Sequence, residues 1–281
     1  MMAELIDRKR LKAETREMLA TARVSPKGMA ALYLGLGLLL NLVDTIANRG
    51  SSDSLISPVG LFVTILTSFL GAVLSVGFVL YCMAIRRGER AEYLTLFDGF
   101  SFVGEIIVLE LVMSLFIVLW SMLFVIPGIV AAYRYQFALY NLCENPGIGA
   151  MEALDMSKRQ TWGYKGQLFM LDWSYFGWVL LSTLPIFAVV GYLVNAGVQM
   201  ASGGSYVPWT LYLHPGQFLV WMVLAGVWSF VVDLFYWPNR QCVMLGYFEI
   251  AKRTSGVGWG AEPPQLGDGS DSGWTGGWGQ M

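Results

Sequence analysis

Long apolar stretches with few charged residues recur along this sequence. A helix needs about 20 apolar residues to cross the roughly 30 Å hydrocarbon core of a membrane, because each residue adds about 1.5 Å. Residues 28–47, 58–85, 168–194 and 218–237 all reach this length. Only 14% of the chain is charged, against about a quarter of a typical soluble domain. The sequence therefore predicts an all-α integral membrane protein.

The stretch 106–143 has two interpretations because the residues Ile126-Pro127-Gly128 interrupt it. It forms either one long kinked helix or two spans joined by a tight turn, since proline breaks a helix and glycine permits a reversal. Short cytoplasmic loops collect Lys and Arg. With two spans, every Lys and Arg except Arg49 and Arg134 falls on one side of the membrane. The charge distribution therefore favours two spans.

The expected architecture is a bundle of six transmembrane helices with both termini in the cytoplasm. The flanking segments differ from it in composition. Residues 1–27 carry charges of both signs together with an apolar stripe, which predicts a cytoplasmic amphipathic segment. Residues 254–281 are rich in Gly and Trp without Lys or Arg, which predicts a disordered cytoplasmic tail. The expected spans are residues 28–47, 58–85, 106–124, 126–143, 168–194 and 218–237.

Four ionisable residues inside these spans form a candidate polar cluster: Arg134, Glu110, Asp172 and Asp233. A charge in lipid costs several kcal/mol and usually implies a partner or a water-filled cavity. Arg134 falls near the middle of the fourth expected span, too far from either surface for its side chain to reach. We therefore expect Arg134 to pair with Asp172 or Glu110 as a structural ion pair. A cation or proton pathway lined by the acids is the alternative.

Motifs that would indicate catalysis are absent from the sequence. It contains no phosphate-binding loop, dinucleotide fingerprint, zinc-protease motif or serine-hydrolase elbow. Cys82, Cys143 and Cys242 are far apart, and His214 is the one histidine. We expect neither an enzyme nor a metal or other cofactor.

The run 119–178 contains a group of short motifs. They are LW followed by IPGI, a YxY, an ENP turn, a glycine and a lysine before LF, and LD-x-S-x-x-GW. Together with LFDGF at 96–100, this run resembles a bacterial family of multi-pass membrane proteins, domain of unknown function 975. The resemblance implies a location in the bacterial cytoplasmic membrane and no agreed activity. That family is distantly similar to the non-catalytic membrane domain of some glycerophosphodiester phosphodiesterases.

Two functions follow as hypotheses. The first is a non-enzymatic accessory, assembly or regulatory subunit that acts through partners. The alternative is a small permease or lipid-handling protein that uses the buried intramembrane charges. The expected partners are the lipid bilayer and other membrane proteins, not nucleic acid.

Overall fold

The computed structural model describes residues 4–48, 58–201 and 215–258, and in this part of the chain every regular element is a helix. One element, η2, is a 3-10 helix. In chain order the elements are α1 (Arg8–Thr21), α2 (Pro26–Ala47), α3 (Pro58–Arg86), η2 (Tyr93–Phe102), α4 (Val103–Leu123), α5 (Val125–Tyr135), α6 (Ala138–Glu144), α7 (Ala150–Gln160), α8 (Lys165–Trp173), α9 (Phe176–Ala201) and α11 (Pro215–Ser255).

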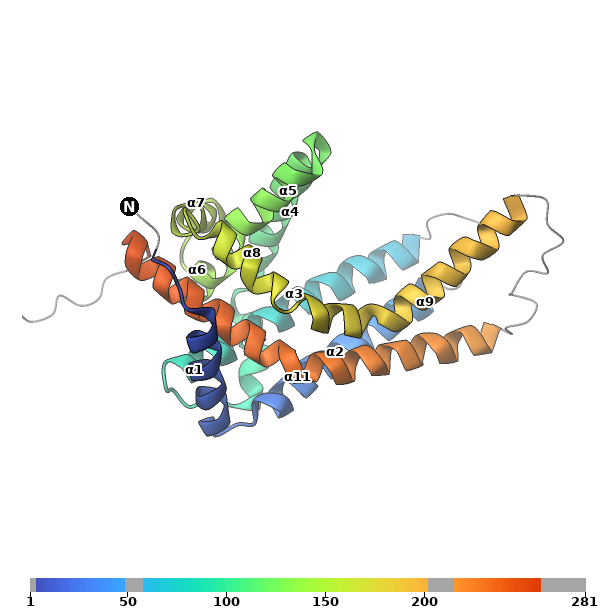
Figure 1. The fold of residues 1–281 in the computed structure, drawn as a ribbon, viewed down its shortest axis with the longest axis horizontal. Helices are drawn as coiled ribbons and strands as arrows, with labels where there is room; N and C mark the ends of the chain where they lie inside the picture. Colours follow the sequence, from blue (N-terminus) through green and yellow to red (C-terminus); the bar gives the residue numbers. More distant parts are fainter. Residues whose placement is uncertain (1–3, 49–57, 202–214, 259–281) are drawn as a thin grey trace, which may run out of the picture.

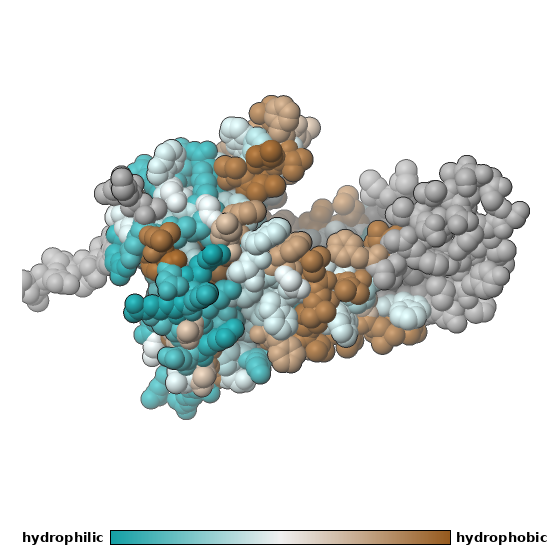
Figure 2. All heavy atoms as spheres, viewed as in Figure 1, coloured by the Kyte–Doolittle hydropathy of each residue, from teal (hydrophilic) through white to brown (hydrophobic). Residues whose placement is uncertain are grey.

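The helices form three regions (Figure 1). We call α1, η2, α6, α7 and the part of α11 after Pro238 the polar end. From it extends the long arm, in which α2 packs on α3 and the first part of α11 packs on α2 and α9. The hairpin of α4 and α5 leaves the polar end in a different direction. Figure 2 shows hydrophilic residues gathered over the polar end and hydrophobic ones over the hairpin and the long arm.

Three helical segments of the described chain are long and apolar enough to cross a membrane: Pro26–Ala47, Pro58–Arg86 and Tyr93–Leu123. They coincide with the first three expected spans, and the third also includes η2. The apolar stretch Phe176–Phe187 at the start of α9 is shorter. The described residues therefore support a helical membrane protein, but not six separate spans.

The fourth expected span, 126–143, is divided into two helices. Hydroxyl groups of α7 end α5: Ser157 Oγ donates to the Arg134 carbonyl at 2.8 Å and accepts the Phe137 N–H at 3.1 Å. Thr161 Oγ1 also donates to that carbonyl. These side-chain bonds satisfy backbone groups that a continuing helix would pair. With 11 residues, α5 is about 16 Å long, roughly half of the hydrocarbon core.

The reversal between α4 and α5 occurs at Phe124, whose backbone is extended. The Ile126-Pro127-Gly128 sequence forms the first turn of α5, where a proline lacks only an N–H that has no partner within the helix. A side chain on Gly128 would collide with Ser121 of α4. Glycine at this position therefore lets the two helices pack closely.

The fifth expected span, 168–194, is also divided. The Ser174 and Tyr175 N–H groups donate to the Leu171 and Asp172 carbonyls at 3.0 Å each, which closes a turn between α8 and α9. The sixth expected span, 218–237, lies within α11, which continues through Pro238 to Ser255. Helix therefore extends past residue 254, where the disordered tail was expected to begin, and residues 259–281 of that tail lie outside the described chain.

The core lies at the polar end and the adjoining part of α3. Tyr81 and Phe78 of α3, Phe137, and Tyr247 and Phe248 of α11 are fully or almost fully buried there. Helix η2 lies directly on α3 at Gly77. A side chain at this position would collide with the Leu96 backbone, so glycine allows the close contact. Helix α1 begins at the N-cap Asp7, whose side chain accepts from two backbone N–H groups, and it packs on α11.

Candidate functional site: a cation-lined cavity beside Pro238 of α11

The four residues of the expected cluster do not form one site. Asp172 of α8 pairs with Arg240 of α11, whose Nη2 lies 2.6 Å from Oδ1. The Tyr133 hydroxyl donates to the other oxygen of Asp172 at 3.0 Å. Arg134 makes no ion pair with any residue that the structure describes. The expected pairing of Arg134 with Asp172 or Glu110 is therefore wrong.

The short α5 explains why Arg134 needs no acid within the membrane. The helix ends one residue after Arg134, where α7 bonds to its carbonyl, so the side chain lies at the polar end. Lys165 at the start of α8 is close enough to interact with the charge of Arg134. Burial and then the positive charge of Arg134 lower the pKa of Lys165. Both cations therefore belong to the base of the hairpin.

The remaining two acids of the expected cluster stand apart. Glu110 is half-buried on α4. Asp233 is half-buried on α11 beside the Tyr236 hydroxyl, and its Oδ1 is buried without a hydrogen-bond partner in the described chain. Neither forms an ion pair with another described residue. The contacts of these residues do not outline a pathway.

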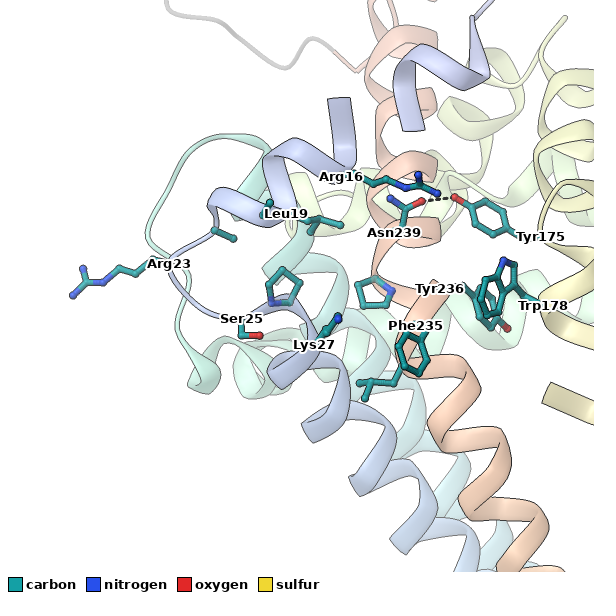
Figure 3. Close-up of a pocket in the computed structure, with 15 residues that line it drawn as sticks. Arg16, Leu19, Arg23, Ser25, Lys27, Tyr175, Trp178, Phe235, Tyr236 and Asn239 are labelled. Carbon is teal, nitrogen blue, oxygen red and sulfur yellow. Dashed lines mark hydrogen bonds between the residues drawn. The ribbon is translucent and has the colours of Figure 1, made fainter. Parts of the chain in front are cut away.

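A cavity of about 540 Å³ lies where α1, the start of α2, the start of α9 and α11 near Pro238 meet (Figure 3). Its volume is typical of small-molecule sites, which measure about 300–1,000 Å³. The charged residues that line it are Arg16, Arg23 and Lys27, and none of the 15 described lining residues is acidic. The cavity therefore carries positive charge that no lining side chain neutralises.

Two of the three cations point into this cavity. Figure 3 shows Arg16 reaching from α1 towards Asn239 and Tyr175, whereas Arg23 points away from the other labelled side chains. The Lys27 Nζ lies 5.6 Å from the ring centroid of Phe235. The Tyr175 hydroxyl donates to Asn239 Oδ1 at 2.6 Å, and Asn239 Nδ2 is a buried donor without a partner in the described chain.

Three cations at four-residue spacing line the side of α1 that faces the turn between α8 and α9. Arg8 Nη1 donates to the Met170 carbonyl at 2.8 Å, and Lys12 Nζ donates to Ser174 Oγ at 2.7 Å. Arg16 follows one turn later at the cavity. Burial lowers the pKa of Lys12 first, and the charges of Arg8 and Arg16 lower it further. The three cations therefore repel one another, and a negatively charged group beside them would relieve this repulsion.

The opposite side of the cavity is aromatic. Trp178 of α9 stacks on Tyr236 of α11 with ring centroids 6.1 Å apart. Phe235, also on the cavity, is 60% exposed on the apolar surface of the long arm. The site thus joins a cationic part at the polar end to an apolar part that faces outward on the arm. This arrangement suits a molecule that is anionic at one end and apolar at the other.

Sequence reasoning missed this site because its cations were used only to decide which segments face the cytoplasm. Arg16, Arg23 and Lys27 belonged to the expected amphipathic segment. Only the folded chain brings α1 against Pro238 and Asn239. The sequence Trp237-Pro238-Asn239-Arg240 at the expected end of that span was the available signal.

Comparison with known proteins gives one match. The model of a family described as Protein of unknown function (DUF975) matches residues 122–254, slightly less than half of the chain. No curated protein and no solved structure matches. The matched residues run from the end of α4 through most of α11, and they include the aromatic side of the cavity but not its cations on α1 and α2. Over this stretch the chain is similar to that uncharacterised family.

Proposed function

We propose that this protein is a non-enzymatic, lipid-handling membrane protein that binds the headgroup of an anionic phospholipid in the cavity beside Pro238. The observation that carries the proposal is the charge of the cavity: Arg16 and Lys27 point into it, none of its described lining residues is acidic, and its aromatic side is open to the surface of the long arm. Of the two functions that the sequence left open, this arrangement favours lipid handling. The cations come from α1 and α2 rather than from the expected intramembrane cluster.

The chemistry of each side chain fits this ligand. Arg16 offers a planar fork of N–H donors that matches two phosphate oxygens, and Lys27 offers a point charge. Trp178 and Phe235 provide the contact that the first carbons of an acyl chain need. Tryptophan favours the interface between the hydrocarbon core and the headgroups, because one end of its ring is apolar and the other polar.

The orientation in the membrane belongs to the same proposal. We place α2, α3, α9 and the first part of α11 across the bilayer, with the polar end and both termini in the cytoplasm. The support is that α1, α7 and the part of α11 after Pro238 carry ten of the 18 Lys and Arg residues, as the cytoplasmic side of membrane proteins does. A bacterial cytoplasmic membrane, and a distant relation to the membrane domain of glycerophosphodiester phosphodiesterases, rest on the sequence resemblance alone.

The test is a lipid titration of the whole protein in detergent. Short-chain phosphatidylglycerol should bind more tightly than phosphatidylcholine of the same chain length. The double variant Arg16→Gln/Lys27→Gln should lose this preference. A cation near a membrane surface contributes about 1 kcal/mol, so each substitution should weaken phosphatidylglycerol binding by about fivefold.

Arg23→Gln is the matched control, because it removes the same charge from a side chain that points away from the cavity. It should leave most of the preference for phosphatidylglycerol intact. Equal binding of the two lipids by the unmodified protein would reject the proposal. So would an equal loss in the control and in the double variant.

A further inference from the structure

The α4–α5 hairpin has a role separate from the cavity. We propose that it enters only the cytoplasm-facing leaflet, turns near the middle of the bilayer and returns, so that its partner is the acyl chains of that leaflet. This proposal rests on the membrane orientation proposed above, but it concerns a surface outside the cavity and does not depend on lipid binding at Pro238.

The length of the hairpin supports insertion without crossing. Ile106 and Leu109 in the first turns of α4 are fully buried against the polar end. The part of α4 from Leu111 to Leu123 is about 20 Å long, and α5 is about 16 Å. One leaflet of the hydrocarbon core is about 15 Å deep. The lengths of both helices therefore suit one leaflet, and α5 is too short to cross the bilayer.

The surface of the hairpin suits lipid on all sides. At the tip, Met122, Phe124 and Ile126 are 80%, 71% and 75% exposed. No Asp, Glu, Lys, Arg or His occurs from residue 111 to residue 132. Figure 2 shows the tip as a hydrophobic projection. An interface with a second copy would use one side of the hairpin, whereas exposed apolar residues surround this tip.

Three polar groups at the turn have hydrogen-bond partners within the hairpin. A backbone group in hydrocarbon must find its partner within the protein, because no water is present. The Phe124 N–H donates to the Trp120 carbonyl, and the Gly128 N–H donates to the Phe124 carbonyl, at 3.3 Å each. Ser121 Oγ donates to the Ile117 carbonyl at 2.7 Å. The turn therefore needs no water for these groups.

Aromatic and cationic residues mark the membrane surface at the base of the hairpin. Phe169 of α8 lies edge-on to Tyr133 of α5, with ring centroids 6.2 Å apart, and stacks on Trp173. Lys165 lies 6.0 Å from the ring of Trp162, which is 73% exposed. Aromatic rings and Lys or Arg side chains collect at the interface between hydrocarbon and water. This belt places the base, rather than the tip, at the surface.

The test uses single cysteines in the full-length protein with Cys82, Cys143 and Cys242 replaced. Val125→Cys is placed at the tip, Val59→Cys at the far end of the long arm, and Glu89→Cys at the polar end. A membrane-impermeant maleimide is applied to each side of the membrane in turn. Val59→Cys and Glu89→Cys should react from opposite sides, whereas Val125→Cys should react from neither. After the membrane is dissolved in denaturing detergent, the same maleimide should label Val125→Cys, which shows that its thiol is intact.

We expect labelling at Val125→Cys to be roughly tenfold or more slower than at either reference, because the reactive thiolate does not form in hydrocarbon. Labelling from the Val59 side would show that the hairpin crosses the membrane and would overturn the proposal. Labelling from the Glu89 side would show that the hairpin lies in water, with the same consequence. Efficient oxidation of two copies of the Val125→Cys variant to a disulfide-linked dimer in the membrane would replace lipid by a second copy as the partner.

Discussion

The polar end has two sides, and they differ in whether their cations have acidic partners. On the side formed by α3, α6 and α11, the cations have acidic partners. Arg86 pairs with Glu249 at 2.6 Å, and Glu144 binds both Arg87 at 3.1 Å and Lys252 at 2.7 Å. On the side formed by α1, the start of α2 and Pro238 of α11, the cations gather around a cavity without an acid in its wall.

This difference separates structural charges from charges available to a ligand. A half-buried cation with a carboxylate partner is already neutralised, and removing the partner leaves a charge that water cannot fully solvate. A cation at an open cavity keeps its attraction for an anion from outside. Substitutions on the first side should therefore change stability, and those on the second side should change binding.

The largest effect is expected from Glu144→Gln. The Glu144 side chain is 13% exposed and joins α6 to both α3 and α11. Loss of its charge leaves Lys252 and Arg87 without this partner, which should lower the free energy of unfolding by about 2–3 kcal/mol. Thermal unfolding in detergent measures this, with the exposed Glu89→Gln as the control. Equal unfolding temperatures for the two variants would remove the distinction between the two sides.

A smaller loss is expected at the second ion pair. Arg86 donates through two nitrogens to both oxygens of Glu249, at 2.9 and 2.6 Å. The Arg86 side chain is only 11% exposed, but that of Glu249 is 46% exposed and partly screened by water. A double-mutant cycle of Arg86→Met and Glu249→Gln should give a coupling energy of about 1 kcal/mol. Additive effects would show that this pair contributes nothing to the joint between α3 and α11.

The smallest stability effect is expected on the cavity side. In lipid-free detergent, Arg16→Gln/Lys27→Gln should change the free energy of unfolding by less than about 0.5 kcal/mol, as exposed substitutions usually do. The sign should favour the variant, because the positive charge that lowers the pKa of Lys12 is reduced. A loss as large as that of Glu144→Gln would mean that these cations hold the fold together. The cations at the cavity would then be structural rather than part of a ligand-binding site.

The apolar pattern was sufficient to predict α2, α3 and α4. These helices depend on length and freedom from charge, which are local properties of the sequence. The reversal near Ile126-Pro127-Gly128 was also predicted, because proline and glycine act on their immediate neighbours. The end of α5 was not, since Ser157 and Thr161 determine it from more than 20 residues further along the chain.

The mistaken length of α5 also explains the wrong partner for Arg134. A span over 126–143 puts Arg134 in the middle of the membrane, whereas a helix that ends at Tyr135 puts it at the polar end. Arg240 was overlooked in a similar way, because α11 was expected to stop before Pro238. The cavity depends on contacts between α1 and α11, which are more than 200 residues apart. No local pattern encodes such a contact.

The proposed function requires that an anionic headgroup occupy the cavity beside Pro238. Its most direct test is photocrosslinking of the whole protein in a bilayer with a phosphatidylglycerol that carries a photoreactive group next to its headgroup, followed by mass spectrometry of the labelled peptides. Adducts should concentrate at residues 16–27 and 234–239, and they should be lost in Arg16→Gln/Lys27→Gln but not in Arg23→Gln. Adducts spread evenly over the lipid-facing helices, or unchanged in the double variant, would contradict the proposed function.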